Sequence, residues 1–370
     1  MAEAPTRRAL MQSGVLVVSG LAFAGCRRRG TQWPDPPPFL TPQDRFYNRL
    51  QAKLADGKFE DRADVPKDPE PPDPATWTLT FKGFDREQTL DAAGLAALAT
   101  RFAPVSYVKT LRCTGDGRGN RLQSTAVWTG IPLMAVLSEL GIPEATRRLR
   151  VRAHDGFSCN LQSRFTHGMD GRPALLATHA NGEPLLPARG GPCRLLIPDR
   201  FGFKNIKWPT EILASPQDEA WGDHEVDRKE GEDDGHISFV SKILSPDVIY
   251  KQEVQEGRAG PVTLQGVACG GLAPIRDIRL RVNGGAWQPV TMIRPAALDS
   301  PVVQQAPGLV FSEWPMPDVA VPWKATLDLP VGTSKVEVMS TNTLGEEQPE
   351  TDTWRTNGDS AWAWVELKLS

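Results

Sequence analysis

The chain has 370 residues, of which 40% are hydrophobic and 24% are charged, and its formal net charge is -3 at pH 7. This is the composition of a globular protein with enough chain for two domains. The near-neutral charge argues against nucleic acid or an anionic membrane surface as the main partner.

The first 26 residues have the pattern of an export signal rather than of a fold. Arg7 and Arg8 precede an apolar run at residues 15–24, which is shorter than the roughly 20 residues that a membrane-spanning helix needs. Paired arginines are typical of the twin-arginine route to the periplasm, although an ordinary secretory signal with chance arginines stays an alternative. The run ends in a sequence similar to a lipoprotein cleavage box at Cys26. Because Phe23 departs from that box, lipidation at Cys26 and cleavage with release both stay open.

Residues 27–75 predict a tether and an N-terminal arm rather than an independent core. Two proline-rich clusters lie in this stretch, and such segments are extended and bury little apolar area by themselves. Between the clusters, Thr41 has the residue type of a helix N-cap and is followed by the aromatic residues Phe46 and Tyr47. We therefore expect a short ordered segment with a helix that begins at Thr41.

From residue 76 to residue 245 the pattern predicts a first folded domain of strands and helices. Apolar residues at helical spacing, closed by Gly141, predict a helix over residues 128–141, and a run rich in alanine and leucine predicts another over residues 91–100. The expected strands cover residues 77–81, 105–111, 149–151, 157–161, 175–178 and 193–197.

Residues 246–370 predict a second domain made of short strands. An acidic, polar stretch at residues 221–235 precedes it as an expected surface excursion, and the composition shifts at Ser245-Pro246. Turn residues then recur at roughly 8 to 12 residues, which is typical of an antiparallel β-sandwich. We expect this domain to serve packing or assembly rather than catalysis.

Four cysteines follow the export signal, and their spacing restricts the chemistry. Cys113, Cys159, Cys193 and Cys269 form no CxxC or CxxCH pattern. A covalent c-type haem and a zinc ribbon are therefore excluded. A disulfide between Cys159 and Cys193 is compatible with the periplasm, but the sequence alone does not decide it.

The strongest candidate for chemistry is the segment at residues 109–120. An apolar run leads into Cys113, three glycines follow at alternate positions, and Arg112 and Arg118 flank the cysteine. A thiolate between two guanidinium groups is stabilised as the anion, so that it can ligate a metal or attack an electrophile. The alternative is a buried cysteine that packs as a small hydrophobic residue before a loop.

Three blocks of sequence occur in the order and near the spacing of one known family. The run from Cys113 to Arg118 resembles a Cys-Ala-Gly-Asn-Arg-Arg signature, with Asp116 and Gly117 in place of the asparagine and the first arginine. Residues 128–133 resemble the family's Trp-x-Gly-x-x-Leu segment. The runs Asn-Gly-Glu-Pro-Leu, Gly-Gly-Pro-Cys-Arg-Leu-Leu-Ile-Pro and Phe-Gly-Phe-Lys-Asn-Ile-Lys-Trp at residues 181–208 complete the likeness. The chain thus resembles the sulfite oxidase family of molybdopterin enzymes from about residue 41 to its C-terminus.

The resemblance implies an α+β fold. A sulfite oxidase-type molybdopterin-binding domain is expected over residues 76–245, followed by an immunoglobulin-like β-sandwich of the dimerisation type over residues 246–370. It also implies a homodimer and an enzyme that depends on a molybdenum–molybdopterin cofactor (Mo-MPT).

By resemblance, Cys113 is the single protein ligand of molybdenum, and a soft thiolate suits such a metal. Arg118 is expected to face the open coordination position and to hold an oxyanion. Arg49 resembles the arginine of the family's N-terminal Phe-x-x-Arg-Asn-His run, although Leu50 and Gln51 replace the last two residues.

The pterin ends in a phosphate, so its pocket needs fixed cations and backbone N–H donors. Arg189 occupies the place of a pterin-contacting histidine in the family. The implied cofactor-binding residues are Asp155, Arg189, Arg194, Lys204, Asn205, Ile206 and Lys207.

The implied activity is oxygen-atom transfer on a small sulfur oxyanion, as in a sulfite dehydrogenase. Because the chain has no haem motif, the electrons are expected to pass to a separate protein such as a c-type cytochrome. Two departures weaken sulfite as the substrate: the signature has lost one arginine, and residues 221–235 lack the family's active-site tyrosine. Two rivals therefore stay open, an S-oxide or N-oxide reductase of the methionine-sulfoxide type and a binding protein with a relic site.

Overall fold

The computed structural model describes residues 31–47, 69–116, 121–162, 171–218, 235–248, 254–271, 273–351 and 360–370, with the backbone of β1 (Gln51–Lys53) and β2 (Phe59–Asp61). The expected export signal and most of the acidic stretch at residues 221–235 lie outside this part of the chain. Within it, no helix has both the length and the apolar character that crossing a membrane requires.

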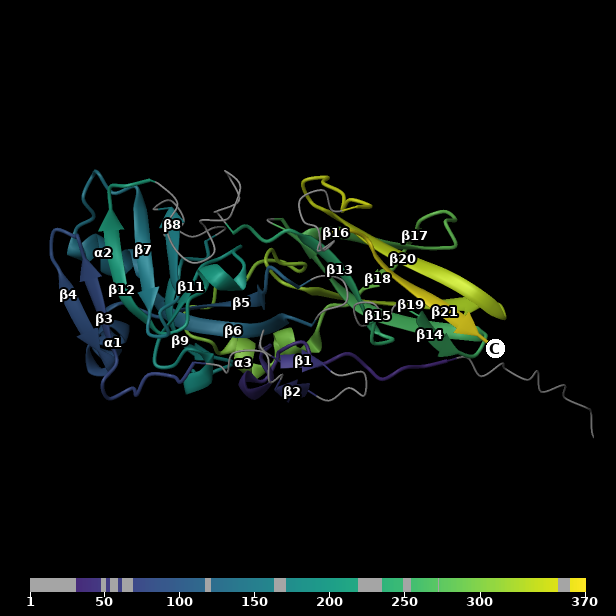
Figure 1. The fold of residues 1–370 in the computed structure, drawn as a ribbon, viewed down its shortest axis with the longest axis horizontal. Coiled ribbons are helices and arrows are strands. Elements are labelled where there is room, and N and C mark those ends of the chain that lie inside the picture. The colour runs from purple at the N-terminus through teal and green to yellow at the C-terminus, as the bar shows by residue number, and fades with distance from the viewer. Residues whose placement is uncertain are drawn as a thin grey trace, which may run out of the picture.

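Two β-rich bodies lie end to end in an elongated molecule (Figure 1). The first body holds two five-stranded sheets. One sheet, antiparallel throughout, has the order β10-β9-β6-β5 with β11 paired to β9, and its strands are β5 (Val105–Arg112), β6 (Gln123–Pro132), β9 (Leu175–Ala180), β10 (Glu183–Pro184) and β11 (Arg194–Leu196). The other has the order β4-β3-β12-β7-β8, in which only β3 and β12 are parallel, and its strands are β3 (Thr78–Lys82), β4 (Gln88–Asp91), β7 (Arg148–Ala153), β8 (Ser158–Gln162) and β12 (Pro209–Ser215).

Two helices pack against these sheets. In α1 (Ala92–Arg101), the side chain of Asp91 caps the first turn by accepting a hydrogen bond from Gly94 N (2.7 Å), which confirms the helix expected there. In α2 (Leu133–Leu140), the residues predicted to face the core are buried, and Gly141 ends the helix at a positive φ of 77°.

Two local expectations are wrong. The helix expected over residues 128–141 begins only at Leu133, because Trp128 lies in β6, a strand buried along almost its whole length. An apolar run of this kind has no alternation that would distinguish a buried strand from a helix. The first short helix is η1 (Gln43–Arg45), and its N-cap is Pro42 with no side-chain cap. Thr41 Oγ1 instead accepts a hydrogen bond from Thr125 N (3.2 Å).

The second body is a sandwich of two sheets with the orders β13-β15-β19-β18 and β14-β21-β20-β16-β17. All its pairings are antiparallel except β14 with β21. The strands are β13 (Phe239–Ser245), β14 (Val254–Gly257), β15 (Gly260–Gly270), β16 (Ile275–Val282), β17 (Gln288–Pro289), β18 (Thr291–Met292), β19 (Val321–Leu329), β20 (Gly332–Asn342) and β21 (Ala363–Leu369). Because β13 pairs with β15, the sandwich includes residues upstream of the boundary expected at residue 246.

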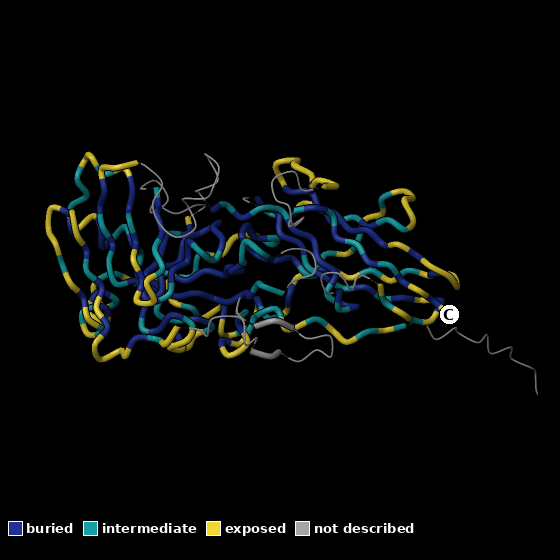
Figure 2. The backbone as a smooth tube through the Cα atoms, viewed as in Figure 1, coloured by how far each residue is buried: buried dark blue, intermediate teal, exposed yellow. Residues whose placement is uncertain are grey.

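A segment inserted between β18 and β19 joins the two bodies. It contains η5 (Ala296–Asp299) and α3 (Pro301–Gln304), and its Leu298 and Val303 are fully buried in one cluster with Val108 of β5 and Val127 of β6. Backbone bonds such as Val310 N to Ser106 O (2.7 Å) fix the segment to β5. β5 and β6 are therefore buried along almost their whole length (Figure 2).

Candidate cofactor site

Cys113 lies directly after β5, where the chain leaves the sheet. Its N–H donates to Leu122 O (2.9 Å), and its carbonyl accepts from Asp116 N (3.2 Å). The thiol is half-buried and free, whereas Cys159, Cys193 and Cys269 are buried free thiols, so Cys159 and Cys193 form no disulfide. Among the described residues, no group of three or more His, Cys, Asp or Glu side chains could hold a metal ion. A metal at Cys113 would therefore not be held by a cluster of three or more such side chains in the described part of the chain.

Tyr47 places a phenol beside this cysteine. A methyl group built on Gly202 would lie 2.3 Å from Tyr47 Oη and 3.4 Å from the carbonyl oxygen of Arg112, so the phenol packs directly on Gly202 beside the end of β5. Burial and the neighbouring Cys113 raise the pKa of Tyr47, whereas Arg194 lowers it. The phenol therefore stays protonated at neutral pH, within electrostatic reach of both the sulfur and the guanidinium.

Arg194, the first residue of β11, provides a buried cation that is 8% exposed. Its Nε donates to Asn205 O (3.1 Å), its Nη1 donates to Arg189 O (3.2 Å), and its guanidinium lies 5.6 Å from the centre of a Trp128 ring. Burial lowers its pKa to about 10, so it remains charged at neutral pH. Among the described residues it has no carboxylate partner, and a buried guanidinium so placed fits an anionic group such as a phosphate.

Two more of the expected phosphate contacts lie around Arg194. Lys207 pairs with Arg194 in an antiparallel bridge, and its Nζ donates to Ala188 O (3.4 Å). Arg189 ends η3 (Pro187–Arg189), and its Nε donates to Gln43 O (2.9 Å). The structure thus brings Arg189, Arg194 and Lys207 together.

The segment after η4 (Gly202–Lys204) is held in place by its own side chains. Asn205 Oδ1 accepts from Ile197 N (2.8 Å), and its Nδ2 donates to Phe201 O (2.8 Å). Ile206 is buried, and its carbonyl accepts from Leu195 N (2.8 Å). These two residues shape the backbone next to Arg194. Lys204 is buried and reaches β8 instead, where its Nζ donates to Asn160 O.

One described residue of the expected site, Asp155, stands apart from this cluster. Asp155 is exposed in the turn between β7 and β8, where its Oδ1 accepts from Phe157 N (3.1 Å). That turn is joined to the neighbourhood of Lys207 through His154 N, which donates to Trp208 O (3.0 Å). Arg49 and Arg118 lie outside the described residues.

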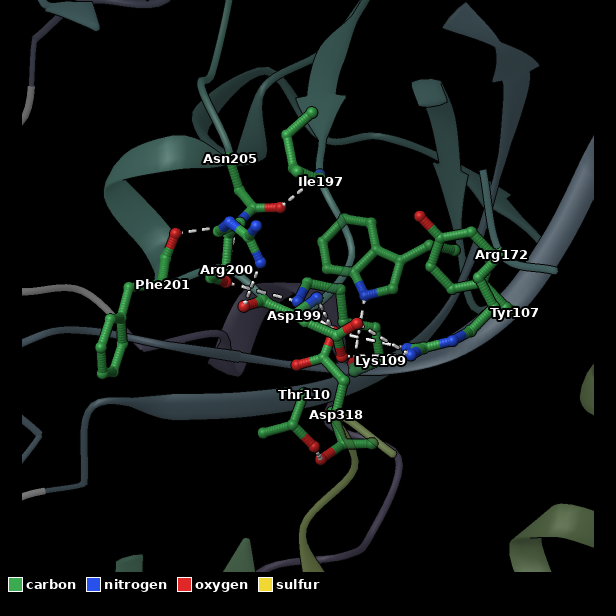
Figure 3. Close-up of polar contacts among 12 residues, drawn as sticks. Tyr107, Lys109, Thr110, Arg172, Ile197, Asp199, Arg200, Phe201, Asn205 and Asp318 are labelled. Atoms are coloured by element: carbon green, nitrogen blue, oxygen red, sulfur yellow. Dashed lines mark hydrogen bonds and ion pairs between the residues drawn. The ribbon is translucent and has the colours of Figure 1, made fainter. Parts of the chain in front are cut away.

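Figure 3 shows a buried ionic network near Asn205. Lys109 of β5 pairs with Asp318, and Arg172 Nη2 lies 3.1 Å from Asp199 Oδ1 and Arg172 Nη1 lies 3.6 Å from Asp318 Oδ2. Burial lowers the pKa of Lys109 and raises that of Asp318 to about 6. The sequence contains one trace of this network, a lysine between apolar residues of β5, but nothing that identifies its partner.

Comparisons with known proteins agree with this geometry. Residues 64–221 match the family described as the oxidoreductase molybdopterin binding domain. The chain is 26% identical over 206 residues to an NADH nitrate reductase of Petunia hybrida, an alignment that covers 49% of this chain and 21% of that protein. It is 30% identical over 164 residues to an NAD(P)H nitrate reductase of Hordeum vulgare, which covers 38% and 18%, so the chain spans about a fifth of the length of these relatives.

Among solved structures, the fold is similar to that of the sulfane dehydrogenase SoxCD from Paracoccus pantotrophus. The TM-score is 0.64 at 17% sequence identity, and the match covers 89% of this chain and 81% of the other. Because the match extends over nearly the whole chain, it includes both bodies of the fold, which confirms the expected fold class.

Proposed function

Because the chain is a molybdopterin-binding oxidoreductase of the sulfite oxidase family, we propose that it is an exported enzyme that transfers an oxygen atom on a small sulfur oxyanion. Sulfite, oxidised to sulfate, is the substrate that we assign first. The electrons pass to a separate protein, for which a c-type cytochrome is our proposal. Export by the twin-arginine route is part of the same proposal and rests on the N-terminal sequence.

The residues present fit the cofactor. Cys113 would bind the metal through its half-buried thiol, while Arg189, Arg194 and Lys207 would hold the phosphate of the pterin. When bound, molybdenum–molybdopterin supplies the oxygen-transfer and redox chemistry. The chain itself supplies placement, charge and hydrogen-bond donors.

Two described groups suit this site to anions. Arg194 is a buried cation whose described hydrogen-bond partners are neutral carbonyl groups, so an anion nearby gains an attraction that no described carboxylate offsets. Tyr47 keeps its proton, because burial raises its pKa, and its hydroxyl can donate to an oxyanion near Cys113. This phenol compensates for the tyrosine that residues 221–235 lack.

The observation that carries the proposal is that Tyr47 lies near both the half-buried thiol of Cys113 and the buried guanidinium of Arg194. That guanidinium has no carboxylate partner among the described residues. Purified protein should contain about one molybdenum and one pterin per chain, measured by elemental analysis and by pterin fluorescence after oxidation. Cys113→Ser should lower oxidation of sulfite at least 100-fold, because the metal loses its protein ligand. Protein without molybdenum after expression with an intact cofactor pathway would leave only the relic-site alternative.

The phosphate contact has its own test. Arg194→Met should reduce pterin occupancy about tenfold or more, because a charge-assisted contact to phosphate is lost. Arg279→Met removes a surface arginine of the sandwich and is the matched control, for which occupancy should not change. Equal occupancy in both variants would remove Arg194 from the cofactor site.

Substrate and direction are separated by two assays on the same preparation. Sulfite oxidation is followed with ferricyanide or cytochrome c as acceptor, and methionine sulfoxide reduction with reduced viologen as donor. Sulfite turnover well above methionine sulfoxide turnover supports the proposal, and the reverse ranking establishes the reductase. A sulfane sulfur compound and nitrate should be included, because they are the substrates that the names of the similar proteins give.

A further inference from the structure

Asp116 is a fully buried carboxylate three residues after Cys113. Its Oδ1 accepts from Leu122 N (2.7 Å) and from the ammonium group of Lys242, and its Oδ2 lies 3.3 Å from Arg112 Nε. All three charged side chains have 0% exposure. The carboxylate is therefore bound by a backbone amide and two cations.

These contacts fix the backbone of the cysteine on both sides. Leu122 donates its N–H to the carboxylate and accepts, through its carbonyl, the N–H of Cys113. Asp116 in turn donates its own N–H to the carbonyl of Cys113 (3.2 Å). We call the described residues 113–116 and 121–122 the Cys113 loop. The Asp116 side chain closes this loop across its base.

The second cation comes from the other body of the molecule. Lys242 lies in β13, a strand of the sandwich. Arg112 also contacts this body, because its Nη1 donates to the carbonyl oxygen of Ser238 (2.8 Å), the residue immediately before β13. The loop that presents the thiol is thus attached to the sandwich by buried charged groups.

This arrangement explains a departure from the family pattern. The resembling signature has an asparagine at this position, and an uncharged amide needs no counter-ion. A buried carboxylate without a cation is strongly unfavourable, and so is a buried ammonium without an anion. Lys242 therefore requires Asp116 as its anion, and the substitution at residue 116 follows from the interface with the sandwich rather than from the substrate.

We propose that Asp116 and Lys242 are positioning residues, which lock the Cys113 loop onto β13 and so make the placement of the metal-binding thiol depend on the sandwich. The consequence of this lock for catalysis rests on the proposed function. The sandwich then has a role at the site in addition to packing.

The test removes the charges of Asp116 and Lys242 singly and together, and it measures how fast the Cys113 thiol is alkylated in cofactor-free protein. Asp116→Asn and Lys242→Met should each raise the rate of Cys113 alkylation by iodoacetamide at least tenfold, because the first leaves two buried cations without their carboxylate and the second removes the link from that carboxylate to β13. In the double variant D116N/K242M the increase should stay well below the product of the two single-variant increases, because both substitutions break the same link. Peptide mapping by mass spectrometry separates Cys113 from the buried cysteines. Glu347→Gln, which breaks an ion pair on the sandwich surface, is the matched control and should leave the rate unchanged.

A purely structural role gives a different pattern. It predicts lower melting temperatures in the single variants with Cys113 alkylation within twofold of the wild type, and that result would overturn the proposal. A fold increase of the alkylation rate in the double variant equal to the product of the two single-variant increases would overturn the proposal as well.

Two measurements apply if a single variant does not fold. Lys242→Arg keeps the cation and should alkylate at the wild-type rate. In the wild type, hydrogen exchange of the Cys113 and Leu122 amides should be no more than about tenfold faster than in β13, because loop and strand open together. Exchange several orders of magnitude faster in the loop would show that it is not locked. Absence of molybdenum from the wild type would overturn the proposed function but leave these comparisons intact.

Discussion

Gly202 and Tyr47 are packed closely together at the candidate site. A methyl group at residue 202 would lie 2.3 Å from Tyr47 Oη, so Gly202→Ala must displace the phenol. We expect a loss of about 1–3 kcal/mol in the free energy of unfolding, the usual range for overpacking. Urea denaturation measures this loss.

Removal of the oxygen should relieve that clash. In the double variant Y47F/G202A, the hydroxyl oxygen is gone and the ring carbon Cζ would lie 3.6 Å from the new methyl group. Its stability should therefore fall within about 1 kcal/mol of that of Tyr47→Phe alone. If G202A is as stable as the wild type, the phenol does not pack on Gly202 in solution.

Asp318 should make stability depend on pH. Burial raises its pKa from 3.8 to about 6 in the folded protein, so the native state holds a proton that the unfolded state has lost between these values. The contribution of Asp318 to the free energy of unfolding is therefore greatest below pH 3.8. It falls as the pH rises to 6, by up to about 3 kcal/mol at 1.36 kcal/mol per pKa unit.

Asp318→Asn cannot lose this proton and provides the comparison. The stability advantage of the wild type over D318N should shrink as the pH rises from 4 to 7, measured by urea denaturation at each pH. An advantage that grows over this range would mean that the pairing with Lys109 outweighs burial and lowers the pKa of Asp318 instead.

At the scale of single residues, local motifs can be read from the sequence, whereas the partners in long-range ion pairs cannot. Cys113, Arg189, Arg194 and Lys207 stay predicted site residues that local motifs identify, and the structure brings the last three together. The partner of Lys109 is Asp318, which is 209 residues away, and no local pattern marks a contact formed only by the fold.

At the scale of elements, strands and helices with clear patterns were predictable, and a fully buried strand was not. β5, α1 and the core face of α2 agree with their predictions, because each has a regular apolar spacing or a cap. β6 is buried on both faces, so its last residues matched a helix as well as a strand. Of the two neighbours that decide the matter, β5 closely precedes β6, but β9 lies far along the chain.

Gly130 in β6 marks the close approach of β6 to β9. A methyl group there would lie 2.4 Å from Leu176 O and 2.6 Å from Ala177 Cα, and backbone atoms cannot swing away. Gly130→Ala should therefore separate the strands and lower the free energy of unfolding by about 3 kcal/mol. Gly115→Ala is the control, because nothing lies within 4 Å of its methyl position, and it should change stability by less than about 0.5 kcal/mol. Similar losses in both variants would contradict this packing.

At the scale of the whole molecule, the two bodies share a core. The segment with η5 and α3 belongs to the chain between two sandwich strands, yet Leu298 and Val303 pack against Val108 and Val127 of the first body. Thr110 N also donates to Asp318 O (2.9 Å). A composition shift located the second domain approximately, but it could not reveal that part of this domain completes the first one.

This shared core predicts that the bodies unfold together. Cys193 lies in the core of the first body and Cys269 in the sandwich, and both are buried thiols that alkylate only after unfolding. Pulse alkylation across a urea series should therefore give one midpoint for both cysteines. Leu298→Ala should cost about 2–5 kcal/mol and shift both midpoints equally, because a cavity in the joining cluster weakens both bodies. Val331→Ala, at a residue 68% exposed in the sandwich, should shift neither midpoint. A shift of the Cys269 midpoint alone in L298A would mean that the joining segment stabilises only the sandwich and that the first body folds independently of it.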